Sequence, residues 1–249
     1  MVRRTPGAGY DRSVGLKLIT NNTRVMVKFV ETELNELKRE VDQMWSLVNS
    51  QMEQARDAVI NLDKNVAQQI IVRERRVDAF ELKIDSDVED FIALFTPVAV
   101  DLRFVLAMLK INSDLERIGD YAHGIARFVN DTGAATFDAG LMEELRVKDM
   151  FSIVLDMLAE LQEALRDEDP VKATSVLSKD DQLDQINKSS ASILSRYAKE
   201  NPDAIPFCLG FAGVFRKLER TGDHLTNIAE EIVFYIDAKV LKHTGLKDA

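Results

Sequence analysis

Apolar residues recur every three or four positions through most of this chain, which is the spacing of one face of an α-helix. With eleven glycines and five prolines in 249 residues, the stretches between helix-breaking residues are long. The pattern therefore predicts an all-α fold of six helices. The first helix is expected to start at about Arg24, and the fourth to span about 139–166. The breaks that separate the six helices lie near Asn61–Asp63, at Thr96–Pro97, at Asp131–Gly133, before Pro170 and around Asn201–Asp203.

The sequence Leu-Glu-Arg-x-Gly-Asp occurs twice, at residues 115–120 and 218–223. A repeat of this kind indicates a duplicated unit. Earlier positions repeat at nearly the same distance, for example Asp63 and Asp169. Three long helices joined by short loops in each half predict two tandem, antiparallel three-helix bundles. The expected divisions are a flexible tail over 1–23, a first bundle over 24–133, a second bundle over 138–243 and a C-terminal tail over 244–249.

Acidic residues run beside the apolar face on the second and third helix of each half. A Glu and an Asp four residues apart are neighbours on a helix, and two like charges there are unfavourable unless something compensates them. Carboxylates converging between two helices would form an oxygen-rich site suited to Fe, Mn, Mg or Ca. The acids are Glu74, Asp78, Glu81, Asp85, Glu89, Glu116 and Asp120 in the first half, and Asp180, Asp184, Glu219 and Asp223 in the second.

A glycine precedes the Asp of each repeated motif, Gly119 in the first copy and Gly222 in the second. Glycine inside a helix costs about 1 kcal/mol relative to alanine. Its presence at both positions therefore indicates that another backbone approaches closely.

Two other interpretations of the acidic residues remain open. The acids could be solvated and paired with basic neighbours in a purely structural interaction module. They could also form the di-metal centre of an enzyme, which a Glu-x-x-His motif on two helices would favour. The chain has one related motif, Asp120-x-x-His123, and no nucleophile–base pair or phosphate-binding loop, so no catalytic activity is expected. The available basic neighbours are Arg75, Arg76, Lys83, Arg117 and Arg220.

Composition narrows the class of protein. A net charge of −10 argues against a general nucleic-acid binder. The apolar runs are shorter than the ~20 residues needed to span a bilayer, and the N-terminus lacks the features of a signal peptide. A single cysteine, Cys208, excludes an intrachain disulfide and fits a reducing cytoplasm, and its apolar neighbours predict that it is a core residue. We therefore expect a soluble, cytoplasmic protein.

These motifs closely resemble those of the PhoU family over about residues 29–243. The resemblance rests on the two Leu-Glu-Arg-x-Gly-Asp copies, on Pro97-x-x-x-Asp101-Leu102-Arg103 and on Asn227-Ile228-Ala229-Glu230. It implies a negative regulator of the phosphate-starvation response and of phosphate uptake. Such a protein links the ATPase subunit of the phosphate ABC transporter to a sensor histidine kinase at the inner face of the membrane, and often forms a homodimer. A PhoU-like partner of a sodium–phosphate cotransporter is the alternative.

The resemblance also implies carboxylate-bound metal ions, with iron or zinc expected and manganese or magnesium as alternatives. The second helix has more acids in the first half, because Asn187 and Ala191 occupy the positions of Glu81 and Asp85. We therefore predict more metal, or tighter binding, in the first half. Carried onto this chain, the first site would use Glu74, Asp78, Glu116 and Asp120 with Glu81 and Asp85, and the second would use Asp180, Asp184, Glu219 and Asp223.

Overall fold

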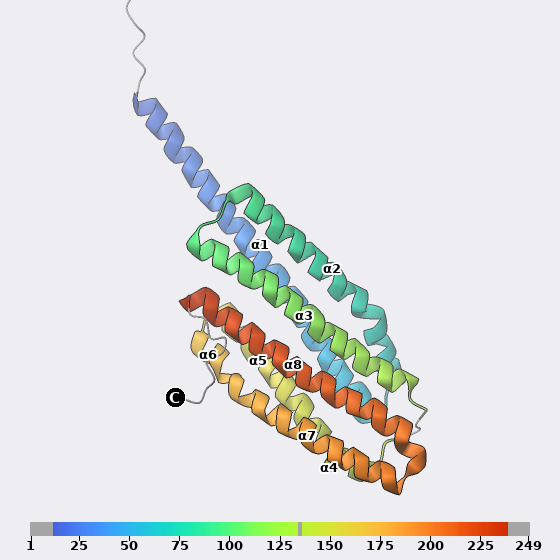
Figure 1. The fold of residues 1–249 in the computed structure, drawn as a ribbon. Helices are drawn as coiled ribbons and strands as arrows, with labels where there is room; N and C mark the ends of the chain where they lie inside the picture. Colours follow the sequence, from blue (N-terminus) through green and yellow to red (C-terminus); the bar gives the residue numbers. More distant parts are fainter. Residues whose placement is uncertain (1–11, 134–135, 239–249) are drawn as a thin grey trace, which may run out of the picture.

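The protein is built from long helices that lie side by side in two groups of three, as Figure 1 shows for the computed structural model. The structure describes residues 12–133 and 136–238, with side chains from Lys28 onward, and this part of the chain contains no strand. The predicted all-α fold of two three-helix bundles is confirmed. The elements are α1 (Arg12–Asn61), α2 (Lys64–Phe95), α3 (Ala99–Asp131), α4 (Ala139–Glu144), α5 (Val147–Asp167), α6 (Pro170–Ser175), α7 (Leu177–Glu200), the 3₁₀ helix η1 (Pro202–Ala204) and α8 (Ile205–Asp237).

Aspartate caps start the second helix of both bundles. The Asp63 carboxylate accepts hydrogen bonds from the backbone N–H groups of Asn65 and Val66, at 2.9 and 3.1 Å. Asp169 does the same at the start of α6, where Pro170 occupies the first turn. Such a cap satisfies N–H groups that have no partner within the helix, and typically stabilises it by about 1 kcal/mol. This shared role explains why the two aspartates recur at equivalent positions.

Two predicted helices are interrupted in the second bundle. The predicted helix over 139–166 is divided into α4 and α5 by Arg146, whose backbone has φ 55° in the left-handed region. Leu145 and Val147 on either side are both buried. Residues two apart point to opposite sides of a continuous helix, so the break lets both side chains reach the core. The predicted fifth helix is similarly divided into α6 and α7 at Val176, which is also buried.

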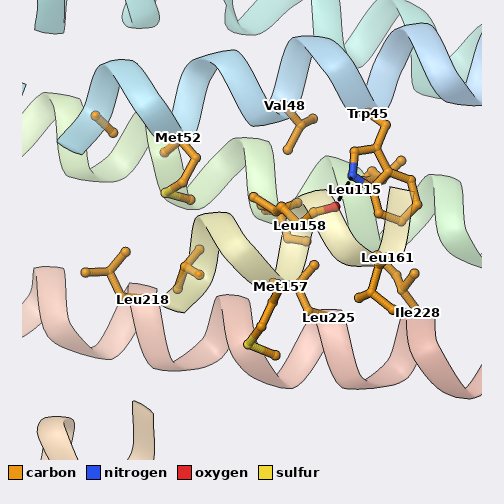
Figure 2. Packing of buried hydrophobic residues seen from close by; sticks show 14 of the residues in the cluster. Trp45, Val48, Met52, Leu115, Met157, Leu158, Leu161, Leu218, Leu225 and Ile228 are labelled. Atoms are coloured by element: carbon orange, nitrogen blue, oxygen red, sulfur yellow. Dashed lines mark hydrogen bonds between the residues drawn. The ribbon is translucent and has the colours of Figure 1, made fainter. Parts of the chain in front are cut away.

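The two bundles share one hydrophobic core. Within each bundle the three helices pack against one another, and across the bundles α3 packs on α8 and α1 packs on α5. Trp45 of α1 is fully buried, and its Nε1 donates to the carbonyl oxygen of Leu158 on α5 at 3.1 Å. Figure 2 shows these two residues among buried side chains of both bundles, including Leu115 and Ile228. The halves therefore form a single folding unit.

The first helix is longer than the periodicity predicted. It begins at Arg12, so residues 12–23 of the expected tail are helical, while the rest of that tail and the whole C-terminal tail lie outside the described residues. Extending an existing helix adds one hydrogen bond for each residue fixed, without a new nucleation cost. In the part of the chain that the structure describes, no helix is both long and apolar enough to cross a membrane.

Candidate functional site: two acidic clusters

The structure brings five of the six acids predicted for the first site into one electrostatic group, here called the first acidic cluster. They come from two packed helices, α2 and α3. Asp78 is exposed, and the other four are half-buried. The charges of Asp78, Asp85 and Asp120 contribute to the raised pKa of Glu81, and those of Asp120 and Glu81 to the raised pKa of Glu116, so the five carboxyl groups lie close together. The members are Asp78, Glu81, Asp85, Glu116 and Asp120.

Glu116 is the most strongly affected member of the first acidic cluster. Burial, followed by repulsion from Asp120, raises the pKa of Glu116 to about 7, although Arg117 opposes the shift. Burial and the charge of Asp85 also raise the pKa of Glu81 above its ordinary value. Burial and repulsion between neighbouring acids therefore both disfavour the ionised carboxylates of this cluster.

Glu74 does not join this group. Its Oε1 lies 2.5 Å from Nδ1 of His123, a half-buried histidine one turn beyond Asp120 on α3. The His123 side chain is 18% exposed. Glu74 would therefore have to leave His123 before it could bind a metal together with Glu116 and Asp120.

The second acidic cluster lies between α7 and α8 and contains Asp180, Asp184, Glu219 and Asp223. Burial, followed by repulsion from Asp223 and Asp184, raises the pKa of Asp180 to about 6. Burial also raises the pKa values of Glu219 and Asp223, with further contributions from neighbouring acids. One Asp180 oxygen, Oδ1, is buried without a hydrogen-bond partner. A buried carboxylate oxygen without a partner is costly, and a cation would compensate it.

One further acid belongs to this neighbourhood although the sequence analysis did not single it out. Asp181 adds to the repulsion that raises the pKa of Asp180. Asp181 directly follows Asp180 in the sequence, and this adjacency could have identified it. The search for acids four residues apart did not include it. Asn187 and Ala191 follow on α7, so the second cluster remains poorer in acids along its second helix than the first.

Basic residues compensate these acids only in part. Arg117 Nε lies 3.4 Å from Glu116 Oε2, and Arg117 Nη1 lies 3.5 Å from Asp120 Oδ2, with the arginine side chain 56% exposed. Lys188 forms an exposed pair with Asp184 at 2.9 Å. Among the described residues, Arg75 and Arg76 form no ion pair with these acids. Exposed pairs of this kind contribute little, at most about 1 kcal/mol each. The solvated-face interpretation therefore explains only part of the arrangement.

The donor atoms are not yet gathered around one point. Within the described ranges, no three His, Cys, Asp or Glu side chains are placed to hold a single metal ion. One cause is visible at Asp85, whose Oδ1 accepts a hydrogen bond from the buried Asn112 at 2.8 Å. The donor set itself is rich in carboxylate oxygens, which suits a hard cation. The residues fit a metal in chemistry and charge, and side-chain rotation would have to complete the geometry.

The repeated glycines have a different cause from the one expected. A Cβ at Gly222 would lie 2.6 Å from both Asp180 Oδ1 and Leu183 Cδ1. A Cβ at Gly119 would lie 3.1 Å from Val77 Cγ1. The close neighbours are thus side chains of the preceding helix, not another backbone. At Gly222 the missing side chain leaves room for an acid of the cluster.

The two clusters are joined through the contact between α3 and α8. Tyr121 follows Asp120, and His224 follows Asp223, at equivalent positions of the repeat. These two residues meet, with Tyr121 Oη 3.2 Å from His224 Nε2. The other histidine nitrogen, Nδ1, lies 2.8 Å from Oδ1 of Asp114 on α3. A polar contact between the bundles therefore connects the backbones that carry both clusters.

Acid pH should stabilise the metal-free protein in the range where these carboxyls titrate. A folded-state pKa above the unfolded value stabilises the fold below the unfolded pKa, and this contribution is lost as pH rises through the folded pKa. The window runs from the ordinary value of 4.5 to about 7 for Glu116, and from 3.8 to about 6 for Asp180. In a chelator, the double variant Glu116→Gln/Asp180→Asn should therefore be more stable than wild type at about pH 8, by on the order of 1 kcal/mol after allowing for solvent screening.

Urea unfolding at several pH values measures this difference. Glu89→Gln, at an exposed acid on α2, is the matched control and should change stability little at any pH. A double variant that is less stable than wild type at about pH 8 would show that the acids are already compensated within the fold.

A helical protein with two tandem three-helix bundles, each carrying acids between its second and third helix, defines the class. The PhoU domain matches this chain twice, over residues 41–129 and 147–232. The matched ranges begin 106 residues apart and end 103 residues apart. The same two distances separate Asp63 from Asp169 and the first Leu-Glu-Arg-x-Gly-Asp copy from the second. The chain belongs to the PhoU domain family.

Curated relatives cover most of the chain. A Pseudomonas aeruginosa protein is 32% identical over 215 residues, covering 86% of this chain and 88% of the relative. A Thermotoga maritima protein is 28% identical over 212 residues, covering 85% of this chain and 90% of the relative. The first is named a phosphate-specific transport system accessory protein PhoU homolog, and the second has the same name with the number 1.

Solved structures show the same fold. The phosphate transport system regulatory protein PhoU from Streptococcus pneumoniae superposes with a TM-score of 0.77 at 28% identity, covering 85% of this chain and 99% of that one. PhoU from Pseudomonas aeruginosa gives a TM-score of 0.76 at 31% identity, covering 84% of this chain and 99% of that one.

Proposed function

We propose that this protein is a non-enzymatic, metal-binding negative regulator of phosphate homeostasis. It would repress the phosphate-starvation response and restrain phosphate uptake. The observation that carries this proposal is the double PhoU domain match across both bundles, together with relatives named as accessory proteins of phosphate-specific transport. Each matched range contains one of the two acidic clusters. The candidate site therefore belongs to the part of the chain that matches the PhoU domain.

The proposed ligands are metal ions held by both acidic clusters, with iron or zinc expected and manganese or magnesium as alternatives. The raised pKa of Glu116 and the unpartnered Oδ1 of Asp180 support a cation at each cluster. A bound cation would lower both carboxyl pKa values and draw the acids of two helices together. It would thereby stabilise one packing of α2 on α3 and of α7 on α8, which is a structural role suited to a regulator.

The proposed partners are the ATPase subunit of the phosphate ABC transporter and a sensor histidine kinase at the inner face of the membrane, with the protein acting in the cytoplasm as a homodimer. A protein that links two partners needs separate surfaces held in a defined relation. The common core of the two bundles supports this, because α3 packs on α8 and α1 packs on α5. A change in the helix packing of one bundle can therefore alter the helix packing of the other.

Deletion of the gene tests the regulatory role. In rich phosphate, a reporter controlled by a phosphate-starvation promoter should rise from background to the level of starved cells. Wild-type protein should restore repression, whereas the double variant Asp120→Ala/Asp223→Ala should not. The control Glu89→Gln should restore it fully, since Glu89 is exposed and belongs to neither cluster.

A reporter that stays repressed after deletion would contradict the proposal. Repression that persists while phosphate uptake through a sodium–phosphate cotransporter rises would support the alternative partner. Affinity purification of the tagged protein with the transporter ATPase subunit gives a second, physical test of the partner assignment.

A further inference from the structure

The first part of α1 extends beyond the bundle to which the helix belongs. Phe29 of α1 packs against Phe95, the last residue of α2, with ring centroids 5.7 Å apart. Residues of α1 that precede Phe29 therefore lie past the end of α2, and Figure 1 shows this stretch running on alone beyond the turn between α2 and α3. At 1.5 Å per residue, residues 12–28 add about 25 Å of helix.

This N-terminal arm, residues 12–30, has a charge opposite to that of the remaining protein. It contains Arg12, Lys17, Arg24 and Lys28 and no Asp or Glu, so it carries four positive charges. The whole chain has a net charge of −10, which leaves −14 for the remainder. A helix of one charge sign on a protein of the other sign is suited to an external anionic surface.

The sequence of the arm has the spacing of an amphipathic helix. Lys17, Arg24 and Lys28 are separated by seven and four residues, which places these positions on one face. Apolar residues repeat at the same intervals on a different face, so the arm combines a basic stripe with a broad apolar one. The apolar positions are Val14, Leu18, Val25 and Phe29, with a second row at Ile19, Met26 and Val30.

Exposed apolar residues also lie at the end of the first bundle that Phe29 contacts. Phe29 is 54% exposed at the base of the arm. At the turn between α2 and α3, Leu94, Val98 and Val100 are 74%, 72% and 60% exposed. Isolated exposed apolar residues are ordinary, but a group of this size beside an apolar helix face indicates a binding surface.

The arm lies outside both ranges of the chain that the PhoU domain matches. The Streptococcus pneumoniae structure is covered over 99% of its length by 85% of this chain. The PhoU domain match begins only at residue 41. The arm therefore precedes the matched domain, whereas both acidic clusters lie inside the matched ranges.

We propose that residues 12–30 bind along the surface of an anionic lipid bilayer, with the apolar face at the acyl boundary and the basic positions among the headgroups. A basic amphipathic helix with little net hydrophobicity lies in the plane of the interface and does not span the bilayer. A second copy of this arm would also cover the apolar face, but it would bring further cations and no anion to pair with them. An anionic lipid surface satisfies both faces at once. This proposal is independent of the proposed phosphate-related function.

Flotation of the purified full-length protein with vesicles tests the proposal. Wild type should bind vesicles of equal parts phosphatidylglycerol and phosphatidylcholine, bind phosphatidylcholine vesicles much more weakly, and bind less as salt increases. The triple variant Lys17→Glu/Arg24→Glu/Lys28→Glu should lose at least ~100-fold in partition coefficient, because each of the three cations near an anionic surface contributes about fivefold. Leu18→Asn/Val25→Asn should also reduce binding, which separates insertion from simple charge attraction.

The matched control carries the same charge change elsewhere. Arg73→Glu/Lys148→Glu/Lys199→Glu alters three exposed cations outside the arm and should bind vesicles within a few-fold of wild type, since its cations face no apolar helix stripe. Because the arm lies past the bundle, the arm variants should keep the unfolding temperature of wild type.

Three results would overturn the proposal. The first is a wild-type protein that does not float with anionic vesicles, and the second is an equal loss of binding in the arm and control variants. The third is absent lipid binding together with a dimer, seen by analytical ultracentrifugation without lipid, that the arm variant abolishes. The last result would assign the arm to a second copy of the chain.

Discussion

Single-site variants should separate the metal content of the two acidic clusters. Asp120→Ala should abolish high-affinity metal binding at the first cluster, and Asp223→Ala should abolish it at the second, each with a loss of at least ~100-fold in affinity. Outer groups that only orient a metal ligand already contribute 10–100-fold, so a lost carboxylate ligand should cost at least the upper part of that range. Elemental analysis and titration calorimetry of the full-length protein measure both effects.

The comparison also tests the inequality of the two halves. The first cluster has Glu81 and Asp85 where the second has Asn187 and Ala191, so Asp223→Ala should retain more metal than Asp120→Ala. Glu89→Gln, outside both clusters, should bind as wild type does. Unchanged metal content in both Ala variants would reject the ligand assignment, and a greater retention by Asp120→Ala would reverse the predicted order. Full-length protein is needed because the two bundles share a core.

Trp45→Ala should lower the free energy of unfolding by about 3–5 kcal/mol. Trp45 of α1 is fully buried where this helix packs on α5. Its removal leaves a cavity between the bundles that rigid helices can fill only in part. It also leaves the Leu158 carbonyl oxygen without its side-chain donor. Urea unfolding monitored by circular dichroism gives the change in stability.

A conservative variant separates packing from hydrogen bonding at this position. Trp45→Phe removes the donor and retains most of the ring, so its loss should be smaller, because a net hydrogen bond contributes about 1 kcal/mol and the remaining volume change is limited. Exposed Phe29 on the same helix supplies a control, since Phe29→Ala should change stability much less. An equal loss for Trp45→Ala and Phe29→Ala would show that the bundles do not depend on this shared core.

Much of the fold was predictable because its determinants are local. The apolar spacing placed the helices, and the cap residues Asp63 and Asp169 begin the second helix of each half by bonding to N–H groups two and three residues away. The duplication was visible in sequence because equivalent positions need equivalent residues. The break at Arg146 was not visible, since it depends on both Leu145 and Val147 reaching a core made by other helices.

The acidic site was predicted as a set of stripes but not as a set of contacts. Four-residue spacing is a local property, so it predicts which acids share a helix face. Whether a carboxylate meets another acid or a basic partner depends on the neighbouring helix. Glu74 meets His123, whereas Asp181, which breaks the spacing, adds to the charge around Asp180.

By itself, the sequence determined that this protein is a duplicated, all-helical chain with paired acids on the second and third helix of each half. Helix periodicity, capping and the repeated Leu-Glu-Arg-x-Gly-Asp motif are readable along the chain because they act over a few residues. The tertiary structure alone decided that α3 and α8 join the halves into one core, that Gly222 leaves space for the Asp180 carboxylate, and that α1 extends past α2. These features depend on side chains far apart in sequence, whose burial and charge are set only when the helices pack.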